Sequence, residues 1–86
     1  MRKKIDYKVT NGKLLRLDIE IIDNKITFVN IFGDFFVYPE TSISLLENCM
    51  LGEVEGVKER LDETIKKNEI VLVGFGSEDI EKLFLN

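Results

Sequence analysis

The stretch KLLRLDIEII, residues 13–22, alternates apolar and polar positions more regularly than the rest of the chain. One face of the predicted strand carries four aliphatic side chains: Leu15, Leu17, Ile19 and Ile21. The opposite face carries three charged side chains: Arg16, Asp18 and Glu20. A period of two with one apolar face is typical of an antiparallel strand between a core and water. The chain is therefore predicted to build a sheet with one buried face.

Shorter strands are predicted on both sides of this one. Apolar residues alternate with polar ones near the N-terminus: Ile5, Tyr7 and Val9. Asn11 and Gly12 then suit the tight turn of a hairpin. After a turn at Asp23 and Asn24, the stretch KITFVNIF, residues 25–32, runs back. These segments predict an antiparallel meander.

The returning strand requires an irregularity. Strict alternation from Ile26 would bury the amide of Asn30, which costs a few kcal/mol unless the amide finds hydrogen-bond partners. A β-bulge near Thr27 and Phe28 shifts the phase and avoids this cost. We therefore expect a bulge that keeps three aliphatic side chains in the core: Ile26, Val29 and Ile31. Phe28 and Phe32 then lie on the outer face, near the ends of the long strand.

Helical patterns dominate the rest of the chain. Residues 38–52 are predicted to form a helix with Pro39 at its first position and Gly52 at its end. Residues 56–68 repeat apolar side chains every four positions, which predicts a second helix. Residues 70–73 read as a short buried strand or extended segment, and Ser77 as the cap of a last short helix. Together these elements predict one α+β domain over residues 1–86, with about three antiparallel strands and helices on one face.

Composition excludes several classes of function. The 86 residues include no histidine, the commonest general base and metal ligand, and a single cysteine, so no disulfide can form within the chain. Twelve Lys plus Arg against 16 Asp plus Glu give a net charge of −4, without the basic stripe of a nucleic-acid-binding protein. The start of the chain does not resemble a signal peptide, and no apolar run is long enough to span a membrane. These features predict a soluble, cytoplasmic protein.

Three motifs are interpreted as structural. The stretch VGFGSED, residues 73–79, contains part of a dinucleotide fingerprint, but Asp79 replaces the third glycine and Glu78 stands beside it, where both would repel a phosphate. Cys49 lies on the apolar stripe of its predicted helix and is expected in the core. The acidic run between residues 53 and 63 is expected to be a solvated face, because its spacing does not bring ligands together.

The stretch GDFF, residues 33–36, is the main candidate for a functional surface. Phe35 and Phe36 point to opposite sides of an extended segment, so one is expected in the core and the other at the surface. With Phe28 and Phe32, they form more apolar surface than a small monomer ordinarily exposes. Asp34 can accept hydrogen bonds from nearby backbone N–H groups. Lys13, at the mouth of the first hairpin, is either a solvated turn residue or a contact to an anionic ligand or partner.

The order of these motifs resembles the small accessory domain of lipoate–protein ligases, either as their C-terminal domain or as the separate small subunit of the archaeal two-part type. The resemblance covers nearly the whole chain. It rests on Gly12-Lys13, the long alternating strand, Ile26 and above all Gly33 to Phe36. The helix end at Leu51-Gly52 and the closing VGFGSEDIEKLF also fit. It implies an α+β fold like that of iron–sulfur scaffold domains, although the three cysteines of such scaffolds are missing.

The resemblance also implies a function. The chain would be the accessory subunit of a two-part ATP-dependent lipoate–protein ligase, inactive alone because it lacks the RRxxGGG-type motif and catalytic lysine of the large domain. It would bind no cofactor by itself, whereas the complex would use ATP and lipoate with Mg. It would be needed when lipoate is activated to lipoyl-adenylate, before transfer to an acyl-carrier lysine.

The implied partners are a large catalytic subunit and, indirectly, lipoyl acceptors such as the 2-oxoacid dehydrogenase E2 and the glycine cleavage H protein. Lys13 and Asp34 are candidate contacts to the partner or adenylate. Four phenylalanines are candidate interface residues: Phe28, Phe32, Phe35 and Phe36. No catalytic or metal-binding residue is expected. The alternative is a non-catalytic scaffold or interaction module of the same fold.

Overall fold

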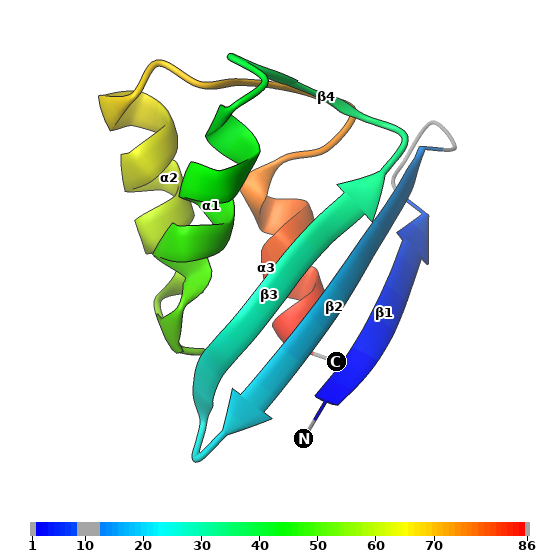
Figure 1. The fold of residues 1–86 in the computed structure, drawn as a ribbon, viewed down its shortest axis with the longest axis vertical. Helices are drawn as coiled ribbons and strands as arrows, with labels where there is room; N and C mark the ends of the chain where they lie inside the picture. The colour runs from blue at the N-terminus through cyan, green and yellow to red at the C-terminus, as the bar shows by residue number, and fades with distance from the viewer. Residues whose placement is uncertain (1, 9–12, 86) are drawn as a thin grey trace.

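The computed structural model describes residues 2–8 and 13–85, and its main sheet is the predicted meander with a short strand added (Figure 1). Strand β1 (Arg2–Lys8) pairs antiparallel with β2 (Leu14–Ile22), and β2 pairs antiparallel with β3 (Lys25–Gly33). The two-residue strand β5 (Gly52–Glu53) joins the outer edge of β3. The predicted strand position of Val9 and the Asn11-Gly12 turn lie outside the described residues.

The bulge in β3 is confirmed. Glu20 of β2 lies opposite Phe28, whereas the next residue, Ile21, lies opposite Ile26, so Thr27 is the extra residue. The Thr27 hydroxyl donates to the Glu20 carboxylate at 2.8 Å. Because of this shift, the aliphatic side chains of β3 enter the core as predicted: Ile26, Val29 and Ile31.

Three helices cover one face of the sheet (Figure 1): α1 (Ser42–Met50), α2 (Val57–Lys67) and α3 (Ser77–Leu85). The apolar face of β2 packs against them, and Leu46, Leu61 and Ile80 supply one fully buried side chain from each helix. The α+β class and the single-sided packing of the helices are confirmed. The likeness to iron–sulfur scaffold domains stays a prediction.

Two helix starts differ from the predictions. Helix α1 begins at Ser42, so Pro39 lies in the preceding turn, where its carbonyl accepts from the Ser42 N–H at 2.9 Å. Ser77 does not cap α3, because its buried hydroxyl donates to the Asp62 carboxylate of α2. The Asp79 carboxylate instead accepts from the Gly76 N–H at 2.8 Å. Asp79, in the first turn of α3, thus satisfies the N–H of the residue just before the helix.

A second, two-stranded sheet lies beside the main one. Strand β4 (Phe36–Tyr38) follows directly after β3 and pairs antiparallel with β6 (Val71–Val73). The short buried strand or extended segment predicted at residues 70–73 is extended, and Ile70 is buried, but the prediction of burial is wrong for Val71 and Val73, which are exposed. An apolar run of this length does not distinguish a buried strand from an edge ribbon.

No helix among the described residues is both long and apolar enough to cross a membrane.

Candidate functional site

An apolar surface lies on the β4–β6 sheet and the adjoining end of β3. Five exposed apolar side chains form it, and we call them the aromatic patch: Phe32, Phe36, Tyr38, Val71 and Val73. Phe36 is the most exposed, at 62%. Isolated apolar residues on a surface are ordinary, but neighbouring strands that both expose apolar residues are typical of an interaction surface.

Strand geometry explains how the patch forms. Phe36 and Tyr38 are two residues apart and share one face of β4, whereas Val37 between them is buried on the other. Their rings stack with centroids 6.4 Å apart. Across the two-stranded β4–β6 sheet, Phe36 pairs with Val73 and Tyr38 with Val71. Two cross-strand apolar pairs therefore face outward together.

A shallow hollow of about 400 Å³ lies between the patch and the first turn of α1. The patch residues Phe32, Phe36 and Tyr38 line it together with Ile43. The exposed Glu40 contributes the carboxylate among its lining residues. The hollow is mostly apolar, and its openness to solvent fits a side chain of another protein better than an enclosed small molecule.

The GDFF stretch divides its two phenylalanines as predicted. Phe36 is exposed, and Phe35 is half-buried and packs on Phe75, with ring centroids 4.7 Å apart. Gly74 lies close to Phe35: a Cβ at its position would stand 3.2 Å from the Phe35 Cβ, tighter than an ordinary contact. The two glycine-containing motifs, around residues 33 and 74, therefore meet in space although they lie far apart in the sequence.

Lys13 and Asp34 lie at the same end of the sheet as the patch. The backbone N–H of Asp34 donates to the Leu14 carbonyl at 2.9 Å, and Lys13 directly precedes Leu14. Both side chains are exposed, and neither forms an ion pair with a described residue. The fold thus brings together the two candidates for contact with a partner or adenylate.

Phe28 is separated from the patch. It shares the outer face of β3 with Phe32, but four residues of extended chain place them about 13 Å apart. The Arg2 guanidinium lies 4.2 Å from the centroid of the Phe28 ring, which is half-buried. Arg2 in turn binds Asp18 on the neighbouring strand. A cation–π contact thus covers this ring within the chain itself.

Sequence reasoning missed three members of the patch: Tyr38, Val71 and Val73. The available signal was the spacing of two between Val71 and Val73, which places both on one face of any strand. The partner strand of β6 was not predictable, because β4 and β6 are separated by two helices in the sequence.

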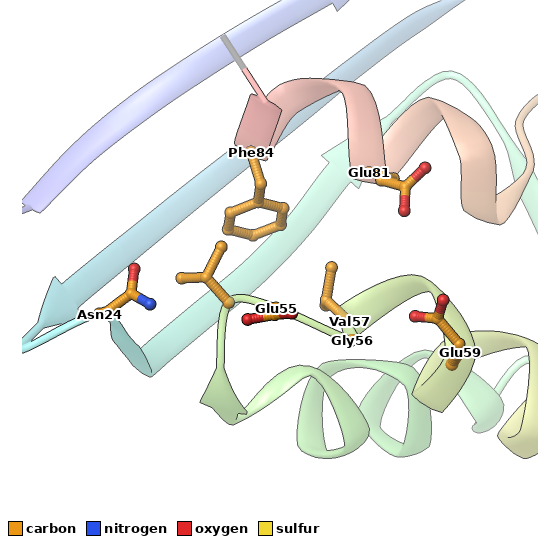
Figure 2. A pocket seen from close by; sticks show the side chains of 8 residues that line it. Asn24, Glu55, Gly56, Val57, Glu59, Glu81 and Phe84 are labelled. Carbon is orange, nitrogen blue, oxygen red and sulfur yellow. The ribbon is translucent and has the colours of Figure 1, made fainter.

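A second hollow, of about 390 Å³, lies at the opposite end of the sheet, beside the turn between β2 and β3 (Figure 2). Phe84 and Val57 line it together with three carboxylates: Glu55, Glu59 and Glu81. Figure 2 shows Glu81 on α3 and Glu59 on α2 facing each other across the gap between the two helices, beside Phe84. Groups of surface carboxylates are ordinarily solvated, and we assign no ligand to this hollow.

The remaining reactive groups have structural roles. Burial raises the pKa of the Cys49 thiol, and its Sγ contacts the Leu46 carbonyl oxygen at 3.1 Å, so the thiol is a poor nucleophile. At the start of α3, the Asp79 carboxylate accepts from the Gly76 N–H at 2.8 Å, and its negative charge disfavours a phosphate there. No three acidic or sulfur-bearing side chains in residues 2–8 and 13–85 are placed to bind a metal ion together.

Fold and site define a small α+β domain with an exposed aromatic patch. No protein-family model matches the chain. Over 47 residues it is 38% identical to the lipoate-protein ligase A subunit 2 of Thermoplasma acidophilum, a match that spans 55% of this chain and about half, 49%, of that relative.

The structural comparison extends over nearly the whole chain. The chain resembles one chain of an archaeal lipoylation system from Thermoplasma acidophilum, solved as a bipartite lipoate protein ligase and its E2 lipoyl domain. The TM-score is 0.84 at 26% identity, covering 98% of this chain and 94% of that one. The resemblance to the small subunit of archaeal two-part lipoate–protein ligases is therefore confirmed.

Proposed function

We propose that this chain is the accessory subunit of a two-part, ATP-dependent lipoate–protein ligase, and that it docks on a larger catalytic subunit through the aromatic patch. The observation that carries the proposal is this patch, on a chain that resembles a component of a bipartite ligase over 98% of its length. Aromatic side chains at the centre of an interface often supply most of its binding free energy.

The arrangement of the patch supports docking on a protein. Phe36 and Tyr38 stand on a three-residue strand that is anchored from below by the buried Val37 and by Phe35 packed on Phe75. A rigid base under exposed rings lowers the entropy cost of ordering them on binding. The hollow beside Phe36 offers a place for a partner side chain.

The chemistry is assigned to the partner. In its 86 residues the chain has neither the RRxxGGG-type motif nor a histidine, and Asp79 occupies the start of α3. ATP and lipoate with Mg are proposed substrates and cofactor of the complex. The accessory subunit contributes by covering the adenylating site, which excludes water and holds lipoate against the α-phosphate. Orientation of two reactants can lower a barrier by several kcal/mol.

This role separates the two half-reactions. Formation of lipoyl-adenylate needs the covered site, whereas preformed lipoyl-adenylate has already passed that barrier. Transfer of the lipoyl group to an acceptor lysine, on a protein such as a 2-oxoacid dehydrogenase E2 or a glycine cleavage H protein, should depend much less on this chain.

The test is to measure the half-reactions separately with a purified catalytic subunit, in the presence and absence of this chain. We expect adenylate formation to fall by at least about tenfold without the chain, equivalent to about 1.4 kcal/mol of barrier, and transfer from preformed lipoyl-adenylate to change by less than about twofold. Equal dependence of both steps would argue for general structural support. Adenylate formed by this chain alone would contradict the proposal.

A further inference from the structure

Gly33 lies where the end of β3 crosses close to the start of β2. Its φ is +150°, a conformation that residues with a side chain rarely adopt. A Cβ built on Gly33 would overlap the Leu14 carbonyl oxygen and would also lie 3.1 Å from the Phe35 ring. The position therefore requires glycine for two reasons: its backbone conformation and its lack of space.

This junction determines where Lys13 stands. The Leu14 carbonyl that excludes a Cβ at Gly33 is also the acceptor of the 2.9 Å hydrogen bond from the Asp34 N–H. Lys13 is attached directly to Leu14, so a displacement of Leu14 moves Lys13 as well. Phe32 and Phe36 lie on either side of Gly33 and Asp34 in the sequence. The contact of Gly33 and Asp34 with Leu14 therefore fixes the position of Lys13 relative to the aromatic patch.

The charges around the patch indicate what the partner presents. Lys13 is an exposed cation without an ion pair among the described residues. Of the exposed carboxylates nearby, Asp34 donates its N–H to the residue after Lys13, and Glu40 lines the hollow beside the patch. A complementary surface would place a carboxylate opposite Lys13 at the rim of an apolar centre. Charges at the rim of an interface help to orient the two partners, and they contribute a part of the affinity that decreases with salt.

We propose that Gly33 is a positioning residue, which holds Lys13 beside the aromatic patch so that Lys13 pairs with a carboxylate of the catalytic subunit. The inference rests on the proposed function, because it assumes that the patch docks on that subunit. It adds that Gly33, the last residue of β3, serves binding through its contact with the neighbouring strand β2.

The experiment is a double-mutant cycle on the dissociation constant of the reconstituted complex, measured at low and high salt. Lys13→Ala should weaken binding about threefold to tenfold at low salt, and clearly less at high salt, as expected for a charge contact at the rim. In a Gly33→Ala chain, the same Lys13→Ala change should weaken binding by less than about 1.5-fold. The Gly33→Ala change has then already displaced Lys13 from the partner carboxylate, so little binding free energy remains to be lost.

Matched controls separate positioning from general damage. Gly52 has a φ of +116° but open space where a Cβ would lie, and it is at the other end of β3. Gly52→Ala therefore imposes backbone strain without the clash, and the effect of Lys13→Ala should remain complete in that background. Lys25→Ala, an exposed lysine also at the far end of β3, should leave the affinity unchanged.

A second variant keeps the test decisive if Gly33→Ala does not fold. Replacing the amide of residue 34 by an ester, through chemical ligation, removes the donor to the Leu14 carbonyl without adding an atom near Gly33. The effect of Lys13→Ala should shrink in this chain as well. An undiminished effect would contradict the positioning role.

The outcomes distinguish this inference from the proposed function. If Phe36→Ala weakens binding but Lys13→Ala does not, the patch docks and the pairing of Lys13 with a partner carboxylate is wrong. If Lys13→Ala lowers the rate of adenylate formation at saturation without changing affinity, the lysine contacts the adenylate and the inference is overturned. If the chain does not bind the catalytic subunit, the proposed function itself fails.

Discussion

Arg60 makes an extensive set of side-chain hydrogen bonds. Its guanidinium donates to the carbonyls of Cys49 at 2.8 Å and Met50 at 3.1 Å, at the end of α1. It also donates to the carbonyls of Glu53 at 2.7 Å and Glu55 at 3.3 Å, on the segment that leads into α2. The last carbonyls of a helix have no partner within the helix, so one side chain satisfies α1 and fixes the segment that follows.

We predict that Arg60→Ala lowers the free energy of unfolding by about 2–3 kcal/mol, because two half-buried and two exposed carbonyls lose a charged donor. Arg60→Lys should lose most of the same stability, since an ammonium group cannot reach carbonyls on two segments at once. Urea denaturation measures both, with the exposed Lys66→Ala as control. If Arg60→Lys unfolded at the same urea concentration as the unmodified chain, this account of Arg60 would be wrong.

Asp62 connects α2 to α3 by accepting hydrogen bonds from two groups. Lys58 donates to it at 2.7 Å, and the buried Ser77 hydroxyl donates to its other oxygen. Lys58 first, and then Ser77, hold the pKa of Asp62 below its ordinary value. Arg16 likewise lowers the pKa of Asp6 on the outer face of the sheet.

A carboxyl group with a lowered folded-state pKa favours folding above its unfolded pKa, and that contribution is lost as the pH falls through the folded pKa. We therefore predict that the unfolding free energy is level near neutrality and declines below about pH 4. Asp62→Asn should flatten part of this decline, and Asp23→Asn, in the exposed turn after β2, serves as control. Chemical denaturation at a series of pH values provides the measurement. An identical acid decline in Asp62→Asn would contradict the assignment.

At the scale of elements, the start of the β4–β6 sheet gives its two neighbouring phenylalanines different roles: one stabilises the fold, and the other is available to a partner. Phe35 packs on Phe75, whereas Phe36 faces outward beside Tyr38. Phe35→Ala should therefore lower the unfolding free energy by about 2 kcal/mol, less than a fully buried phenylalanine would, because Phe35 is only half-buried. Phe36→Ala should change it by less than about 0.5 kcal/mol. Thermal unfolding of the two variants compares them, and the reverse order would mean that the two rings are wrongly placed.

The strongly patterned elements of this fold were predictable from the sequence. The alternation of residues 15–21 indicated the inner face of β2, and the cost of burying Asn30 indicated the bulge at Thr27. Both signals are local, because neighbouring residues along one strand determine them. The period of four from Val57 to Leu61 likewise predicted the buried side of α2.

The aromatic patch was only partly predictable, because it depends on pairing between distant segments. Phe32 and Phe36 were found from their place around Gly33. Val71 and Val73 looked like core residues, since a short apolar run gives no indication of whether a strand is central or an edge. The cation–π contact between Arg2 and Phe28 was not predictable, because it forms only after β1 and β3 are brought to either side of β2.

At the scale of the whole molecule, the sheet has two different ends. The aromatic patch, Lys13 and Asp34 lie where β3 ends, and the hollow lined by Glu55, Glu59 and Glu81 lies beside the turn where β3 begins. The outer face between them carries ion pairs across the strands, such as Asp6 with Arg16. A partner bound to the aromatic patch would therefore leave the hollow at the other end of the sheet uncovered. This arrangement fits an accessory subunit that docks through one end and covers a neighbouring site.

The central claim is that the aromatic patch docks this chain on a catalytic ligase subunit. The most direct measurement is the rate of lipoyl-adenylate formation by a fixed amount of catalytic subunit, titrated with the unmodified chain, with Phe36→Ala, or with the control Lys25→Ala. The account predicts that Phe36→Ala raises the half-maximal concentration at least about tenfold, as expected for loss of a central aromatic contact. The rate at saturation should return to that of the unmodified chain, and Lys25→Ala should match the unmodified chain throughout. An unchanged half-maximal concentration for Phe36→Ala would contradict the account.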